Sequence, residues 1–119
     1  MNKYEVQMCV MDCLLDDDVE SLPSLMQALN DEDPSSWRIA RGQAFSVEEV
    51  QAALQSLSAT GHVTQFVEEP PDFRLRPITS HDVGLKNPWE SIWFHLERKG
   101  REEHAQWWED EGRRKYPKR

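Results

Sequence analysis

The pattern of apolar and polar residues predicts two helices near the start of the chain. In residues 4–15 apolar side chains recur every three to four positions, which is typical of a helix buried on a wide face. A second stripe runs over residues 21–30, where Ser21 can cap the helix and Pro23 fits its first turn. The acidic run Asp16 to Asp18 lies between the two stripes, which predicts a solvated turn there.

A third helix, followed by a strand, is the clearest local pattern. Ser46 and Glu49 have the spacing of a capping box. One buried helical face is formed by apolar residues at helical spacing: Val47, Val50, Leu54 and Leu57. Gly61 follows the last apolar turn, where a residue that tolerates a positive φ ends a helix at little cost. Residues 62–68 then alternate with a period of two, so a strand is expected there.

The connection between the second and third helices is long. Residues 31–44 exceed the three or four residues of a minimal helix-turn-helix. We expect Trp37 and Ile39 to anchor this connection on the core, and Arg38 and Arg41 to point outward.

The C-terminal third predicts strands and one more helix. A long loop with four prolines contains a short strand near residues 73–76, and a strand over 91–97 has Trp93 and His95 on the side opposite its apolar residues. A helix is expected from about residue 98. The basic residues 113–119 are expected to be a disordered tail, which leaves one domain over residues 1–112.

Two segments resemble the winged helix-turn-helix superfamily of bacterial transcription regulators. VEEVQAALQSLSATGHV is similar to the third helix and its glycine turn, and WFHLERKGREEH is similar to the returning wing strand and the step into a last helix. Leu96, Gly100 and Arg101 keep the pattern of that step, whereas Glu97 stands where the family usually has a capping threonine. The resemblance implies an α+β winged helix with a three-helix core, a β-hairpin with a long wing loop and a C-terminal helix. It also implies that the third helix enters the DNA major groove and that the wing touches the backbone or minor groove.

The charge is unevenly distributed along the chain. The net charge is −8, and residues 1–34 alone hold nine acidic residues and one lysine. The other residues hold thirteen acids and thirteen bases, so a basic face remains open to them. However, the third helix carries no lysine or arginine, although phosphate contacts by basic side chains supply much of the affinity for DNA.

A first hypothesis is therefore a small DNA-binding transcription regulator. Gln51 and Gln55 would read bases. Phosphates would be held by basic residues that flank the helix: Arg38, Arg41, Arg74, Arg76 and Lys86. The alternative for these five residues is that they are solvated or paired with neighbouring acids.

A second hypothesis is a winged helix used for protein interaction without DNA. Trp93, Trp107 and Trp108 are candidate interface anchors, since tryptophan is enriched at binding hot spots and this superfamily commonly dimerises through terminal helices. A homodimer or another protein partner is expected. The alternative is that the wing loop covers Trp93 and that Trp107 packs beside the first helix.

No motif indicates catalysis, a cofactor or a metal. The four histidines are scattered, and no phosphate-binding glycine loop or metalloprotease motif occurs. Cys9 and Cys13 lie four positions apart in an apolar pattern, which is typical of packed, reduced thiols. Without an apolar run of membrane-spanning length or a signal peptide, a cytoplasmic protein without cofactor and without enzymatic activity is expected.

Overall fold

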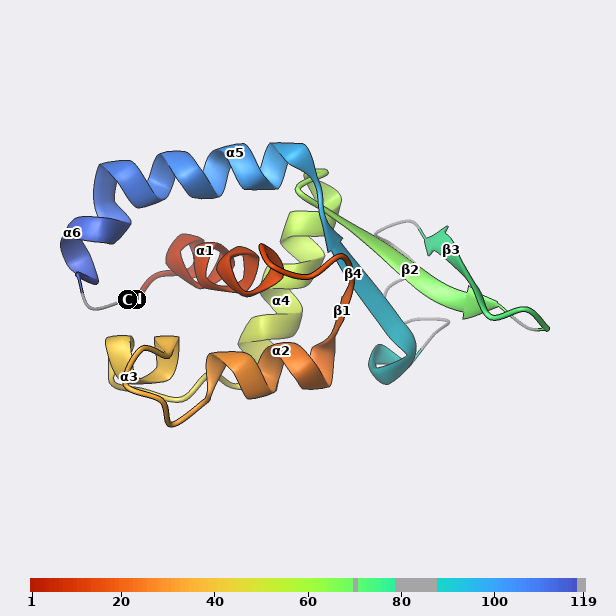
Figure 1. The fold of residues 1–119 in the computed structure, drawn as a ribbon, viewed down its shortest axis with the longest axis horizontal. Coiled ribbons are helices and arrows are strands. Elements are labelled where there is room, and N and C mark those ends of the chain that lie inside the picture. The colour runs from red at the N-terminus through yellow and green to blue at the C-terminus, as the bar shows by residue number, and fades with distance from the viewer. Residues whose placement is uncertain (70, 79–87, 118–119) are drawn as a thin grey trace.

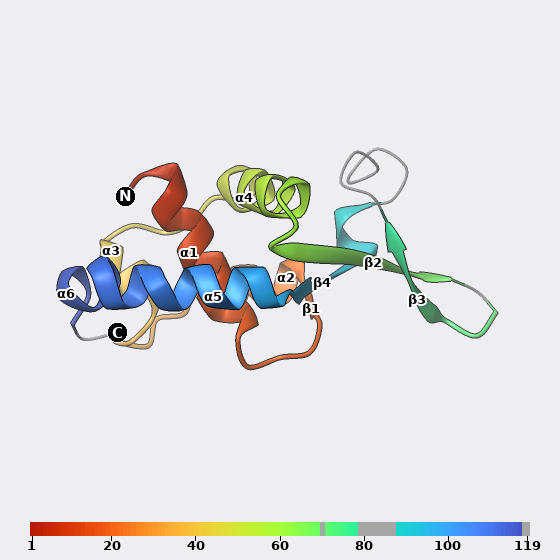
Figure 2. The same ribbon diagram turned by 90° about the horizontal axis from the view of Figure 1, so that it is seen from above.

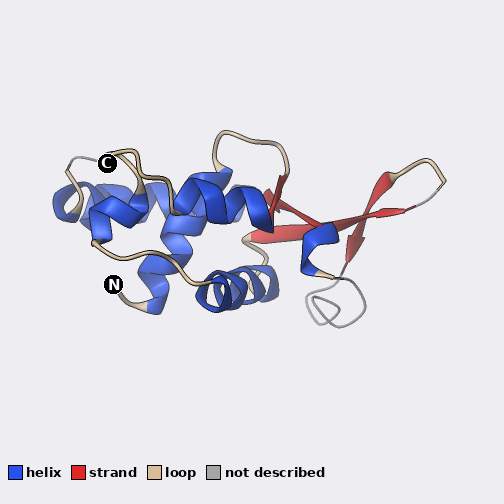
Figure 3. Ribbon diagram, turned by 90° about the horizontal axis from the view of Figure 1, so that it is seen from below, coloured by secondary structure: helices blue, strands red, loops and turns tan. Residues whose placement is uncertain are grey.

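The computed structural model describes residues 1–69, 71–78 and 88–117. The helices are α1 (Lys3–Leu14), α2 (Leu22–Leu29), α3 (Trp37–Arg41), α4 (Val47–Ala59) and α5 (Arg98–Trp107). The strands are β1 (Glu20–Ser21), β2 (Val63–Glu69), β3 (Arg74–Ile78) and β4 (Ile92–Leu96). The long helices gather at one end of the molecule and the strands extend to the other (Figure 3), so the expected α+β class is confirmed.

The strands form one antiparallel sheet in the order β1-β4-β2-β3. Strand β2 lies in the middle, with Phe66 opposite Trp93 of β4 on one side and opposite Pro77 of β3 on the other. The hairpin β2–β3 extends beyond the helices as a narrow arm (Figures 1 and 2), and the molecule measures 46 × 27 × 22 Å.

The core lies between the inner face of the sheet and the helices. Helix α1 lies among the other helices and contacts α2, α4, α5 and β4 (Figure 1). Its buried residues meet those of α4 and of the inner sheet face, which include Met8, Met11, Leu14, Leu54, Leu57, Val63, Ile92, Phe94 and Leu96. The period-two alternation of β4 therefore buries three residues and leaves Trp93 and His95 on the outer face, as predicted.

The predicted helix ends are confirmed in atomic detail. The Ser46 hydroxyl accepts a hydrogen bond from the Glu49 backbone, and the Glu49 carboxylate accepts one from the Ser46 backbone, which completes the capping box. At the other end Gly61 has a φ of 79°. The backbone N–H of His62 donates to the Leu57 carbonyl at 2.9 Å, which closes the helix in a Schellman turn.

The connection between α2 and α4 differs from the expectation. Trp37 is fully buried and donates its indole N–H to Asp12 at 3.0 Å, so its anchoring role is confirmed. Ile39 is 48% exposed, and the prediction that it anchors the connection is wrong. The reason is that residues 37–41 form the short helix α3, which turns Trp37 inward and Ile39 outward.

The C-terminal end is also more ordered than expected. Helix α5 continues through a π-helical turn (Trp108–Gly112) into α6 (Arg113–Lys115). The sequence predicted a disordered tail from residue 113, whereas the structure has helix α6 over Arg113–Lys115. The Tyr116 ring packs edge-on against Trp37 at a centroid distance of 5.2 Å, and its hydroxyl donates to Glu5 at 3.1 Å. In the described part of the chain, no helix combines the length and the apolar character that crossing a membrane requires.

Candidate functional site

The outward side of α4 carries few charges, and these are acidic. The helix buries Val50, Ala53, Leu54 and Leu57 against the core. Its exposed residues include Glu48, Ala52, Gln55 and Ser56, while Gln51 is half-buried. Val47 in the first turn is 43% exposed, so the prediction that it belongs to the buried face is wrong. Of the two glutamines predicted to read bases, Gln55 is thus the more accessible.

Arg41 is not available to a phosphate, although the sequence predicted that it points outward. Its side chain is only 6% exposed. One guanidinium nitrogen lies 2.6 Å from a carboxylate oxygen of Glu49, and another lies 3.4 Å from the second oxygen. The same group donates to the carbonyls of Gln43 and Ala44 at 2.8 and 2.6 Å and lies 3.6 Å above the Phe45 ring. These four hydrogen bonds and the ring contact hold the guanidinium at the start of α4.

The same pair defines the electrostatics at the start of α4. The hydrogen bond from Arg41 is the main cause that lowers the pKa of Glu49 below its usual value, against the opposing effect of partial burial. Glu49 is therefore a carboxylate held in its charged form by an internal partner. Because the two charges cancel, the pair offers an approaching phosphate no net attraction.

The remaining predicted cations do not gather beside α4. Arg38 lies on α3, where its guanidinium is 3.9 Å from Glu32 and 3.5 Å from the Asn30 carbonyl. Arg74 and Arg76 lie on β3, at the opposite end of the molecule from α3 (Figures 1 and 2). Lys86 lies outside the described residues.

The register of the hairpin places the two arginines of β3 on the same face of the sheet. Arg76 is opposite Val67 and Arg74 is opposite Glu69, which places both arginines on the side of the sheet that faces the helices. Both side chains are exposed, and the Arg74 guanidinium lies 3.3 Å from Asp72. The wing arginines thus point to the same side as α4, but one of them already has a carboxylate neighbour.

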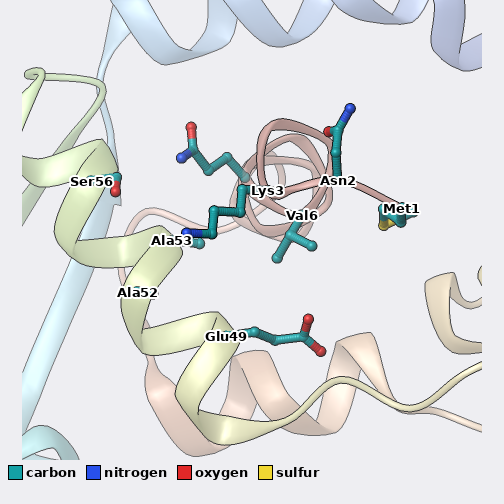
Figure 4. Close-up of a pocket in the computed structure, with 9 residues that line it drawn as sticks. Met1, Asn2, Lys3, Val6, Glu49, Ala52, Ala53 and Ser56 are labelled. Carbon is teal, nitrogen blue, oxygen red and sulfur yellow. The ribbon is translucent and has the colours of Figure 1, made fainter.

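A groove between α1 and α4 contains a cation that the sequence reasoning missed. Its floor is formed by Val6 and Ala53, and Lys3 and Glu49 lie on its sides (Figure 4). The cavity measures about 200 Å³, which is smaller than typical small-molecule sites. Lys3 adds one basic group near α4. The sequence did not predict this position, because it depends on how α1 packs beside α4.

The outer sheet face, defined here as Phe66, Leu75, Pro77 and Trp93, is an apolar surface. Phe66 is half-buried and directly paired with both Pro77 and Trp93. Leu75 is 40% exposed on the adjoining position, and Phe73 at the hairpin turn is 65% exposed. Phe66, Pro77 and Trp93 thus lie side by side across three strands, and Leu75 extends this apolar surface along β3.

The tryptophans predicted as interface anchors fall into different environments. Trp93 lies on the outer sheet face and is half-buried. Trp107 is only 3% exposed and packs against Trp37 and Tyr116, so it offers little surface to a partner. Trp108 is half-buried beside Trp107. Trp93 and Trp108 are thus both half-buried, but Trp108 packs against the core cluster, whereas Trp93 lies on the outer sheet face.

Three of the four histidines are described, and they lie in separate places, each close to a carboxylate. His62 bonds to Glu103 and lies 2.5 Å from the Thr60 hydroxyl, at the junction of α4 and β2. The other two are His95, near Asp18, and His104, near Asp12. Within the described residues, no group of three or more metal-ligating side chains comes together.

Comparisons with known proteins give no relative. No protein-family model matches the chain, and neither a curated protein nor a solved structure matches it.

Proposed function

We propose that the chain is a winged-helix domain. Three features support this assignment. Helices α1, α2 and α4 pack around one core, α4 turns at Gly61 directly into β2, and β1 pairs with β4 beside the hairpin. In this assignment α4 is the third helix of the core and β2–β3 is the wing.

We further propose that this domain binds a protein partner through the outer sheet face rather than duplex DNA through α4. The observation that carries this proposal is the fate of Arg41. Arg41 was predicted to bind a phosphate beside α4, but its guanidinium is hydrogen-bonded to Glu49 and to two backbone carbonyls. The exposed face of α4 then holds Glu48 and no basic residue, whereas the outer sheet face is apolar and accessible.

DNA binding remains the second candidate, because Arg74 and Arg76 lie on the side of the wing that faces the helices. Together with Lys3, and with Lys99, whose ammonium donates to the Thr60 carbonyl at the end of α4, they would supply four cations around α4. Since specific DNA binders commonly make roughly six to ten phosphate contacts, this number is low.

An electrophoretic mobility shift assay with mixed-sequence duplex DNA separates the two candidates. We expect no shift at about 10 μM protein in about 50 mM salt, where non-specific DNA binders are already detectable. Binding that weakens steeply towards about 200 mM salt, and that is lost in Arg74→Ala/Arg76→Ala, would overturn the protein-binding proposal. Arg113→Ala is the matched control, because this exposed arginine on α6 lies at the opposite end of the molecule from the wing (Figure 1) and pairs with Glu109.

A further inference from the structure

The outer sheet face has an acidic surround. Glu68 on β2 lies opposite Leu75 and is exposed. Asp18, whose carboxylate is 95% exposed, lies 3.7 Å from His95 on the same face. Glu97 accepts a hydrogen bond from Thr64 at 2.7 Å at the next position of this face.

The strand register keeps the two arginines of β3 off this face. Arg74 and Arg76 alternate with Leu75 and Pro77, so they project to the opposite side. Three carboxylates therefore surround an apolar patch on the outer side, where the His95 ring lies 3.7 Å from Asp18 and 3.9 Å from Glu97.

We propose that the outer sheet face docks a basic, amphipathic protein segment. Its apolar side chains would pack on Phe66 and Trp93, and its lysines or arginines would lie beside Glu68 and Asp18. A cation can also rest on the Trp93 ring, since arginine and lysine are attracted to aromatic faces. This inference rests on the proposed protein-binding function and names the chemistry of the partner.

Charge complementarity favours such a segment over a second copy of this chain. In a two-fold dimer each copy presents the same patch, so the carboxylates around one face would meet those around the other. Like charges placed together across an interface oppose association, whereas opposite charges steer it. The net charge of −8 acts in the same direction at longer range.

The position of Pro77 favours packing on the face over strand addition at the edge. In the described residues the edge strands of the sheet are β1 and β3; β1 has only two residues, and Pro77 within β3 has no backbone N–H to donate. A partner therefore gains more from the side chains of the face than from the backbone of the edge.

The test uses the full chain and three dye-labelled synthetic peptides of equal length, read by fluorescence anisotropy. One peptide alternates leucine and lysine, one leucine and glutamate, and one leucine and serine. We expect the leucine–lysine peptide to bind and the leucine–glutamate peptide not to bind. Trp93→Ala should weaken binding about tenfold or more, as expected for a hot-spot tryptophan.

A charge reversal on the face has a matched control elsewhere. Glu68→Lys should weaken binding of the leucine–lysine peptide by roughly three- to tenfold. The reversal removes one attraction and adds one repulsion, each about as strong as an exposed ion pair. Glu48→Lys makes the same change on α4, away from the outer face, and should leave the affinity nearly unchanged. Circular dichroism of each variant shows whether it is folded.

Several outcomes would overturn the inference. If Glu48→Lys weakens binding as much as Glu68→Lys, the attraction is only that of the net charge. If the leucine–serine peptide binds as tightly as the leucine–lysine peptide and Trp93→Ala abolishes both, the protein-binding function stands but the basic partner is wrong. If no peptide binds and duplex DNA does, the proposed function fails. A dimer that dissociates on Trp93→Ala, measured by sedimentation, would show that a second copy occupies the face.

Discussion

At the scale of single residues, Arg41 has a structural rather than a ligand-binding environment. Its guanidinium joins the last turn of α3, the Gln43 and Ala44 carbonyls and the carboxylate of Glu49. Glu49 at the same time closes the capping box of α4. One buried side chain thus fixes where the connection ends and where α4 begins.

Arg41→Ala is expected to destabilise the fold by about 2 kcal/mol at neutral pH, because Glu49 would lose the partner that offsets its partial burial. The lowered pKa of Glu49 gives this effect a pH dependence. The stabilisation is complete above the unfolded-state pKa of about 4.3 and is lost as the pH falls through the lower pKa of the folded state.

The measurement is urea denaturation of wild type and variant at neutral pH and at about pH 3, where the difference between them should shrink. Arg38→Ala is the control. Its side chain is 40% exposed and 3.9 Å from Glu32, so it should change stability by less than about 0.5 kcal/mol. A similar loss in both variants would contradict the structural role of Arg41.

At the scale of elements, features set by residues close together in sequence were predicted correctly, whereas features set by packing between elements were not. Helix α4 and its caps were predicted because Ser46, Glu49 and Gly61 act within a few residues of one another. The side to which Trp93 points was predicted because a strand alternates with a fixed period. The prediction that Arg41 points outward was wrong because its position depends on α3. This five-residue helix has no apolar stripe long enough to recognise in the sequence.

Gly100 illustrates a close contact that also depends on how elements pack. A Cβ at this position would lie 2.6 Å from the backbone oxygen of His62 and 2.5 Å from a methyl carbon of Leu96. Helix α5 therefore approaches the α4–β2 junction more closely than any side chain permits. The resemblance had marked Gly100 and Arg101 only as a pattern, and the packing gives the reason for the glycine.

Gly100→Ala is expected to destabilise the protein by about 2–3 kcal/mol through this overlap, even though alanine is the better helix former by about 1 kcal/mol. Gly61→Ala is the informative comparison, since its Cβ would have open space and only the φ of 79° opposes it. That variant should lose about 1 kcal/mol. Thermal unfolding of both variants tests the order, and a larger loss for Gly61→Ala would contradict the close packing of α5.

At the scale of the whole molecule, the two ends of the described chain are joined. Glu5 near the start of α1 has a side chain only 7% exposed, and it accepts hydrogen bonds from Tyr116 at 3.1 Å and Lys115 at 3.4 Å. Burial alone would raise the pKa of Glu5, but these two donors lower it overall. The C-terminal residues thus cover Trp37 and satisfy a buried carboxylate 111 positions earlier.

This tie predicts a loss of stability at alkaline pH. Burial, followed by the hydrogen bond to Glu5, raises the pKa of Tyr116 to about 12. Because the folded-state pKa lies above the unfolded value of about 10, the contribution is complete below about pH 10 and is lost as the pH rises towards 12. Tyr116→Phe should cost about 1 kcal/mol at neutral pH and remove this alkaline dependence, since the ring stays but the hydroxyl is gone.

Tyr116→Ala should cost more, about 2–3 kcal/mol, because Trp37 also loses the ring that packs on it. Tyr4→Phe is the matched control at neutral pH, since its hydroxyl makes an exposed hydrogen bond to Glu103 at 3.3 Å. Urea denaturation of the four proteins gives the order of stability. If both Tyr116 variants match wild type, residues 113–116 behave as the free tail that the sequence predicted. A graded loss would instead mean that the C-terminal segment is part of the core and that Trp37 and Trp107 are sealed from partners by the chain itself.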